Sequence, residues 1–97
     1  MRFSARTIPK RVEGTDGSPL GAEFVVLDAP GRIVRGLNPT GARIFNLCDG
    51  RNSAEQIART IAAEFDADLT TVLPDVLGFL EALGARGLIV PRAEGVP

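Results

Sequence analysis

The sequence lacks histidine, tryptophan and tyrosine, and it contains a single cysteine. Without histidine the chain has lost the commonest general base and metal ligand, and one cysteine cannot complete the ligand set of a zinc site. The lone thiol also excludes an internal disulfide, so folding does not depend on oxidation. Neither glycine-containing segment, residues 29–32 or 36–41, has the spacing of a phosphate-binding loop. We therefore expect no catalytic set, no metal and no cofactor.

A strong excess of basic residues is missing too, since the 97 residues carry a net charge of −1. Proteins that bind nucleic acid by neutralising phosphates need such an excess. No apolar run approaches the roughly 20 residues of a membrane span, and the N-terminus has no secretory signal. We expect a cytoplasmic protein that binds neither nucleic acid nor membrane. The exception to the charge balance is a basic N-terminal arm with Arg2, Arg6, Lys10 and Arg11, predicted to be a flexible tail or a guide for an acidic partner.

Two β-branched runs predict a hairpin near the middle of the chain. Residues 22–28 and 32–37 have strand length, and Ala29-Pro30-Gly31 between them is typical of a tight turn. The second run carries Arg32 and Arg35, as edge strands often do. Residues 7–14 allow one more short strand, whereas the Asp-Gly and Pro-Leu-Gly sequences within residues 15–21 predict a loop.

At Asn38 the spacing of apolar residues changes from that of a strand to that of a helix, which predicts a first helix. Asn38 is a good N-cap and Pro39 suits the first helical position, where no backbone donor is needed. Asp49-Gly50 should end this helix, with the glycine in the left-handed conformation. Cys48 falls on its apolar face and is expected to be a buried structural thiol rather than a nucleophile.

Two further helices follow. Ser53 and Gln56 have the spacing of a capping box, and the apolar stripe of the second helix runs through Ile57, Ile61 and Phe65. The third helix should begin after Thr70 or Thr71, include Pro74 in its first turn and stop at Gly87. Its apolar stripe is long enough to form one wall of a groove.

The element order predicts an α+β fold: a small N-terminal antiparallel sheet of two or three strands, followed by three helices in a winged-helix-like arrangement. The apolar residues 88–90 could form a short closing strand. A chain of this length makes one domain. We expect an ordered core over residues 7–90 and a flexible polar tail over residues 91–97.

Three functions fit this outline. An edge strand beside an apolar helix favours capture of a peptide by strand addition, although the arginines could merely protect the edge and Phe79 could be only core. DNA binding is the second function. A helix that enters the major groove needs a basic stripe, whereas the third helix offers Asp75 and Glu81 and, only near its end, Arg86. A scaffold that dimerises through the same edge is the third.

Three motifs together carry a resemblance to a known family. They are Leu37-Asn38 at the end of the strand, the small-residue helix ending in Asp49-Gly50, and the pattern Asp75, Phe79-Leu80, Leu83, Gly87-Leu88. With these, residues 22–90 resemble the PqqD-like family, small proteins named for pyrroloquinoline quinone (PQQ) biosynthesis protein D, also called the RiPP recognition element. The central motif looks closer to stand-alone members, including those of lasso-peptide clusters, than to the quinone-pathway protein.

The resemblance implies a peptide chaperone without catalytic activity. Family members bind the leader of a ribosomally made precursor peptide and present the peptide to a modifying enzyme, for which a radical S-adenosylmethionine (radical SAM) protein is one candidate. The leader adds as a strand beside the third strand, against the third helix. Carried over to this sequence, the peptide-binding residues are Arg32, Ile33, Val34, Arg35 and Leu37 on the edge and Asp75, Val76, Phe79 and Leu83 on the helix.

Overall fold

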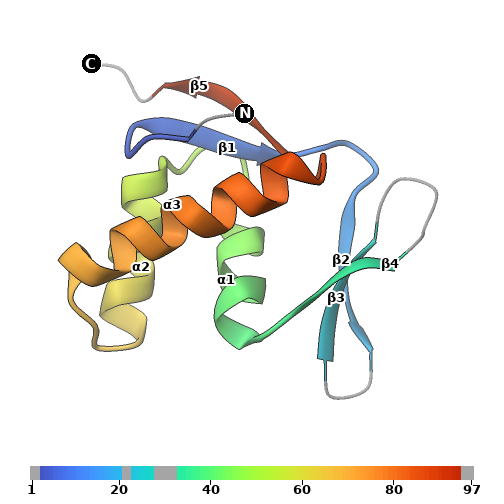
Figure 1. Cartoon of the computed structure of the whole chain (residues 1–97), viewed down its shortest axis with the longest axis horizontal. Helices are drawn as coiled ribbons and strands as arrows, with labels where there is room; N and C mark the ends of the chain where they lie inside the picture. The colour runs from blue at the N-terminus through green and yellow to red at the C-terminus, as the bar shows by residue number, and fades with distance from the viewer. Residues whose placement is uncertain (1–2, 21–22, 28–32, 95–97) are drawn as a thin grey trace.

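The computed structural model describes residues 3–20, 23–27 and 33–94 (Figure 1). Its elements are β1 (Thr7–Arg11), β2 (Asp16–Leu20), β3 (Glu23–Leu27), β4 (Ile33–Leu37), α1 (Pro39–Leu47), α2 (Ala54–Glu64), α3 (Leu69–Ala85) and β5 (Ile89–Glu94). The predicted α+β class, with antiparallel strands before three helices, is confirmed. The strands form two small sheets, one of β1 and β5 and one in the order β2-β3-β4. None of the helices in these ranges is long and apolar enough to cross a membrane.

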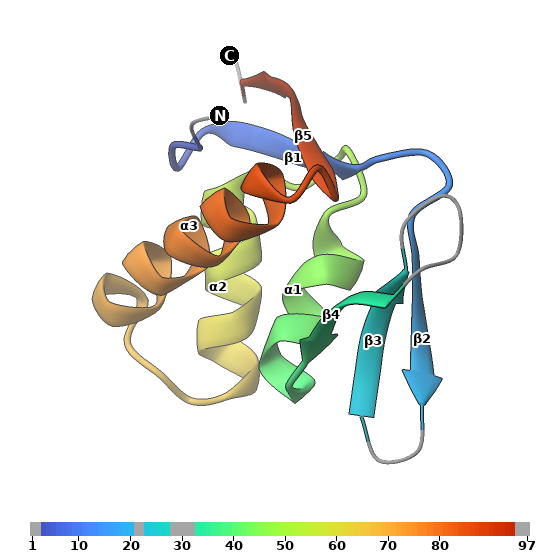
Figure 2. The same cartoon turned by 45° about the vertical axis from the view of Figure 1, so that its right-hand side comes forward.

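The first sheet joins the two ends of the chain. β1 pairs antiparallel with β5, so that Thr7 lies opposite Glu94 and Arg11 opposite Ile89, and Figure 2 shows both strands together above the helices. β5 therefore continues four residues past the predicted closing strand, into the segment expected to be a flexible tail. Pairing with β1, far away in the sequence, holds those residues in place.

β2 corrects the prediction of a loop over residues 15–21. It pairs with β3 in a register that places Gly17 opposite Val26 and Pro19 opposite Phe24. Gly17 is required there because a Cβ at this position would lie 2.5 Å from Cζ of the Phe24 ring. β2 is an edge strand, which is where a proline can be tolerated in a sheet. Gly17, a residue type common in loops, thus lies in a strand because it allows the Phe24 ring to approach β2 closely.

β3 and β4 form the predicted hairpin, but its register is irregular. Val26 pairs with Arg35 and Leu27 pairs with Ile33, so the register passes over Val34, as in a β-bulge. β4 is the second edge strand of this sheet. The predicted turn over residues 29–31, and Arg32 after it, lie outside the described residues.

The predicted start of α1 is confirmed, and its end comes slightly early. Asn38 Oδ1 accepts a hydrogen bond from the backbone N–H of Gly41 (2.7 Å), and Pro39 is the first helical residue. The C-cap is Cys48 rather than Asp49. Gly50 has the predicted positive φ of +79°, and its N–H donates to the carbonyl of Pro9 in β1 (3.0 Å), which ties this loop to the first sheet.

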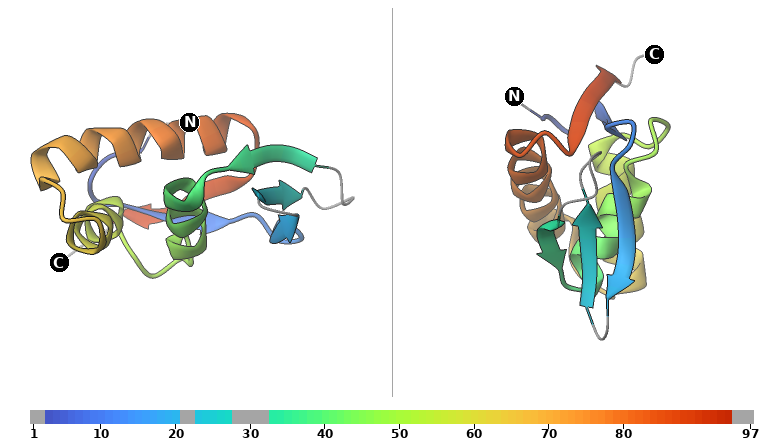
Figure 3. Two further views of the ribbon diagram at one scale, coloured as in Figure 1. Left: turned by 90° about the horizontal axis from the view of Figure 1, so that it is seen from below. Right: turned by 90° about the vertical axis from the view of Figure 1, so that its right-hand side faces the viewer.

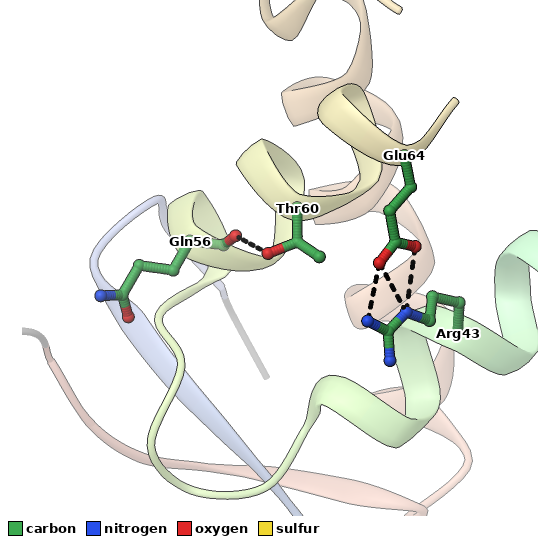
Figure 4. A network of polar contacts seen from close by, with 4 residues as sticks. All are labelled: Arg43, Gln56, Thr60 and Glu64. Atoms are coloured by element: carbon green, nitrogen blue, oxygen red, sulfur yellow. Dashed lines mark hydrogen bonds and ion pairs between the residues drawn. The ribbon is translucent and has the colours of Figure 1, made fainter. Parts of the chain in front are cut away.

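α2 has the predicted capping box, since Gln56 N–H donates to Ser53 Oγ (3.2 Å) and Ser53 N–H to Gln56 Oε1 (2.7 Å). Its predicted stripe fails at Phe65, which lies past the end of the helix with 50% of its surface exposed. Figure 4 shows two further interactions of α2. Thr60 donates to the carbonyl of Gln56 (3.1 Å), and Glu64 pairs with Arg43 of α1 (2.7 Å).

α3 begins earlier than the sequence predicts. Asp68 is its N-cap and accepts from Thr70 N–H, so the first helical residue is Leu69. Pro74 is then the sixth residue rather than part of the first turn, and it has no N–H to give to the carbonyl of Thr70. The predicted stop is confirmed, because Gly87 has a φ of +74°.

The three helices and both sheets share one core. Its members are Phe3, Val26, Leu37, Ile44, Phe45, Cys48, Ala54, Ile57, Ala58, Ile61, Val72, Val76, Leu80, Leu83, Leu88 and Ile89. Phe3 lies in the segment expected to be an N-terminal arm; its ring is buried and its N–H donates to the carboxylate of Glu81 in α3 (2.9 Å). The N-terminal segment is therefore packed against α3 at Phe3.

Candidate functional site

A cavity of about 340 Å³ lies between β4, the N-terminal part of α1 and α3, with one residue contributed by α2. Its lining residues are Gly36, Leu37, Asn38, Thr40, Gly41, Ile44, Ile61, Val72, Asp75, Val76 and Phe79. Both views in Figure 3 show β4 on the α3 side of its sheet, with β3 and then β2 farther away. The cavity therefore lies beside the edge strand that faces α3.

The outer edge of β4 is open. β4 pairs with β3 on one side, and within the described ranges no strand pairs with its other side. In an antiparallel ladder, roughly every second residue of an edge strand directs its N–H and C=O groups away from the sheet. These groups give the strip between β4 and α3 backbone donors and acceptors, next to an apolar cavity.

The cavity floor belongs to the core, and its wall is partly exposed. Leu37, Val72 and Val76 are buried core residues that also line the cavity. Phe79 is half-buried and packs against the same core from α3. An apolar side chain from a ligand would therefore meet a preformed apolar surface.

The polar groups lie around this apolar surface. Asp75 is exposed and is the only charged residue among the described residues that line the cavity. Asn38 and Thr40 come from the first turn of α1, where the Asn38 side chain is already engaged as the N-cap. The positive end of the α1 dipole thus lies across the cavity from a carboxylate.

The structure brings most of the predicted site residues together. One cavity is lined by Leu37, Asp75, Val76 and Phe79. Residues 33–35 belong to the edge strand β4. Leu83 does not join them, because its side chain is 0% exposed and packs inside the core.

Seven lining residues were missed by the sequence analysis: Gly36, Asn38, Thr40, Gly41, Ile44, Ile61 and Val72. Asn38 was recognised as a helix cap and as part of a family motif, but not as a residue of the site. The position of the α1 start at the mouth of a cavity depends on where α3 packs, so no local pattern signals it.

Cys48 lies in the core, as predicted, and does not line this cavity. Its thiol donates to the carbonyl of Ile44 (3.3 Å), and burial raises the pKa of the thiol to about 12. A thiol in this environment is a poor nucleophile. Within residues 3–20, 23–27 and 33–94, no group of three histidine, cysteine, aspartate or glutamate side chains could hold a metal ion.

Comparison with protein families gives a match to the model described as "Coenzyme PQQ synthesis protein D (PqqD)", over residues 23–89. A "PqqA binding protein" of Xanthomonas campestris pv. campestris (strain 8004) is 39% identical over 64 residues, which cover 66% of this chain and 68% of the relative. A protein of the same name from Rhodopseudomonas palustris (strain HaA2) is 31% identical over 72 residues, covering 74% and 70%.

Two solved structures are similar along most of their length. One is TbiB1 in complex with the TbiA(beta) leader peptide, with a TM-score of 0.72 and 30% identity, covering 88% of this chain and 99% of TbiB1. The other is the solution structure of the PqqD part of Methylobacterium extorquens PqqCD, described as a functional, stand-alone RiPP recognition element. Its TM-score is 0.77 at 26% identity, and the match covers 91% of this chain and 94% of that one.

Proposed function

The chain belongs to the PqqD family, and on that basis we propose that it is a RiPP recognition element, which binds the leader of a ribosomally made precursor peptide and presents the peptide to a modifying enzyme. Relatives that bind PqqA, and a similar structure that holds a leader peptide, support the proposal. The chemistry then belongs to the partner enzyme, for which a radical SAM protein is one candidate. The compartment that fits is the cytoplasm, where ribosomes make such precursors.

The observation that carries the proposal is the open edge of β4 beside α3. A peptide in extended conformation can pair with that edge through main-chain hydrogen bonds. Alternate side chains of the added strand then point toward the cavity lined by Leu37, Val76 and Phe79, and the others point away. The main chain supplies affinity for any extended segment, and the cavity supplies the choice among segments.

The test selects a displayed library of random 12-residue peptides on the full chain, and synthetic PqqA is tested separately. The best binders are then titrated into the isotope-labelled protein. We expect the amide resonances of residues 33–37 and 72–79 to shift. N-methylation of successive peptide amides should weaken binding at every second position, because alternate amides face β4.

Two variants of α3 form a matched pair. Phe79→Ala should weaken binding at least about tenfold, as expected when an aromatic contact in a binding cavity is removed. Leu77→Ala, which also trims an apolar side chain packed against the core but does not line the cavity, should change binding less than about twofold.

Several results would contradict the proposal. They are a library that yields no binder, shifts confined to other elements, or an N-methylation pattern that repeats every three to four residues, which indicates a bound helix. A dimer that peptide cannot dissociate would favour the scaffold function instead. Tight, sequence-selective binding of DNA at low salt would favour the winged-helix alternative.

A further inference from the structure

The Phe79 ring of α3 lies next to the space that a side chain at Gly41 of α1 would occupy. Gly41 is the third residue of α1 and is buried. A Cβ built on Gly41 would lie 3.1 Å from Cζ and 3.4 Å from Cε1 of the Phe79 ring. Both residues also line the cavity. A side chain at position 41 would therefore be tight against the Phe79 ring in its present position.

The backbone at Gly41 is held in place. Its N–H donates to Asn38 Oδ1 at 2.7 Å, and Pro39 restricts the same helical turn. On the other side, α3 is anchored by Val76 and Leu80, which are buried on either side of Phe79 in sequence. Both helices are thus tied down near the cavity, and the atom nearest to a side chain added at residue 41 is Cζ of the Phe79 ring.

We propose that the Gly41–Phe79 contact determines specificity by keeping the cavity open for a bulky apolar side chain of the bound peptide. This inference rests on the proposed function, since it concerns the same cavity. With glycine at 41, the ring lies against α1 and the volume beside it stays empty. A methyl group at 41 moves the ring by a few tenths of an ångström, and the open space next to the ring is the cavity.

The contact can be changed from either helix. Gly41→Ala pushes the ring into the cavity and reduces the room for a large side chain. Phe79→Leu removes the tip of the ring, where the closest approach to Gly41 occurs, and so relieves the clash that alanine creates. The two substitutions should therefore not be additive, as expected for residues in direct contact.

The experiment measures the affinity of the tightest library peptide in four versions, with its most strongly required apolar residue as Phe, Leu, Val or Ala. Gly41→Ala should weaken binding of the Phe and Leu versions about tenfold and of the Ala version less than about twofold, in the range known for small size changes in apolar pockets. The double variant with Phe79→Leu should regain most of the loss.

Gly78→Ala is the control for replacing a helical glycine. It also lies on a helix of the site, but a Cβ there would meet nothing within 4 Å. All four peptides should bind it within about twofold of the unmodified protein, because the added methyl group points into open space. Urea unfolding of each variant separates a binding effect from a loss of fold, since Gly41→Ala also adds a methyl group 3.2 Å from the Asn38 cap oxygen.

Two outcomes would overturn the inference while leaving the proposed function intact. One is binding by Gly41→Ala that matches Gly78→Ala for every peptide version. The other is an equal loss for all four versions that Phe79→Leu does not relieve, which would indicate damage to the helix cap. Failure of the unmodified protein to bind any library peptide would instead reject the proposed function.

Discussion

The guanidinium of Arg11 in β1 donates from Nη1 to the carbonyl oxygen of Asn46 in the last turn of α1, 2.9 Å away. The same nitrogen lies 3.1 Å from the carbonyl of Phe45, and the guanidinium carbon is 5.7 Å from the centre of the Phe45 ring. The last carbonyls of a helix have no partner within it and carry its negative partial charge. A residue far away in the sequence thus caps α1, which has no basic residue in its own last turn.

Arg11→Ala should lower the free energy of unfolding by about 1–2 kcal/mol, because it removes charge-assisted hydrogen bonds to carbonyls at a helix end. Urea unfolding measures the change. Arg43→Ala is the control, since it breaks an ion pair whose side chains are 43% and 38% exposed. Such exposed pairs contribute little to stability, because solvent screens the charges. Equal losses in both variants would argue against a capping role for Arg11.

Gly17→Ala should destabilise the protein by about 1–3 kcal/mol, the usual range for overpacking. The methyl group would meet the rings of both Phe24 and Phe45 (2.5 and 3.2 Å) and separate β2 from the core. Thermal unfolding monitored by circular dichroism provides the comparison with Gly78→Ala, whose methyl group has free space. That control should be neutral or slightly stabilising. A loss no larger than that of Gly78→Ala would contradict the close approach.

Pro74→Ala should stabilise the protein by about 1 kcal/mol or more, because it restores an N–H that can donate to the Thr70 carbonyl and removes an interior helical proline. Pro39→Ala is the matched control. Proline at the first position of α1 costs no hydrogen bond, so its replacement should bring no gain. Chemical denaturation of the two variants in parallel decides between these expectations, and the absence of a gain from Pro74→Ala would count against the assigned start of α3.

The Cys48 thiol should make stability fall at alkaline pH. Burial raises its pKa from 9.0 to about 12, so between these values the native state keeps a proton that the unfolded state has lost. The free energy of unfolding then decreases with rising pH, by at most about 1.4 kcal/mol per pH unit. Urea unfolding from pH 8 to 11 should show this extra slope relative to Cys48→Ala.

A second measurement on the same thiol follows from its burial. At pH 8, iodoacetamide should label native Cys48 far more slowly than it labels the protein in urea, because the native thiol is protonated and inaccessible. Labelling at the same rate in both conditions would mean that Cys48 is accessible in the folded protein. Parallel pH slopes for the unmodified protein and Cys48→Ala would contradict the raised pKa.

The sequence determined the local features of this protein. The Asn38 cap with Pro39, the capping box of Ser53 and Gln56, and the stop at Gly87 are interactions among neighbouring residues, and each was predicted correctly. The β3–β4 hairpin and the three helices follow in the same way from the periodic spacing of apolar residues along the chain. The family resemblance used these same motifs, and the family match covers residues 23–89.

Only the tertiary structure decided what those elements contact. β2 looked like a loop because Gly17 and Pro19 disfavour strands; the Phe24 ring packed on Gly17 explains the glycine, and the edge position of β2 explains the proline. Phe3 looked like part of a tail because its partner Glu81 is 78 residues away. Leu83 and Phe79 share one helical stripe in the sequence, yet Leu83 faces the core and Phe79 the cavity. Hydrophobic period shows that a helix has an apolar face, but the angle at which α3 crosses α1 decides which of its residues remain open to a ligand.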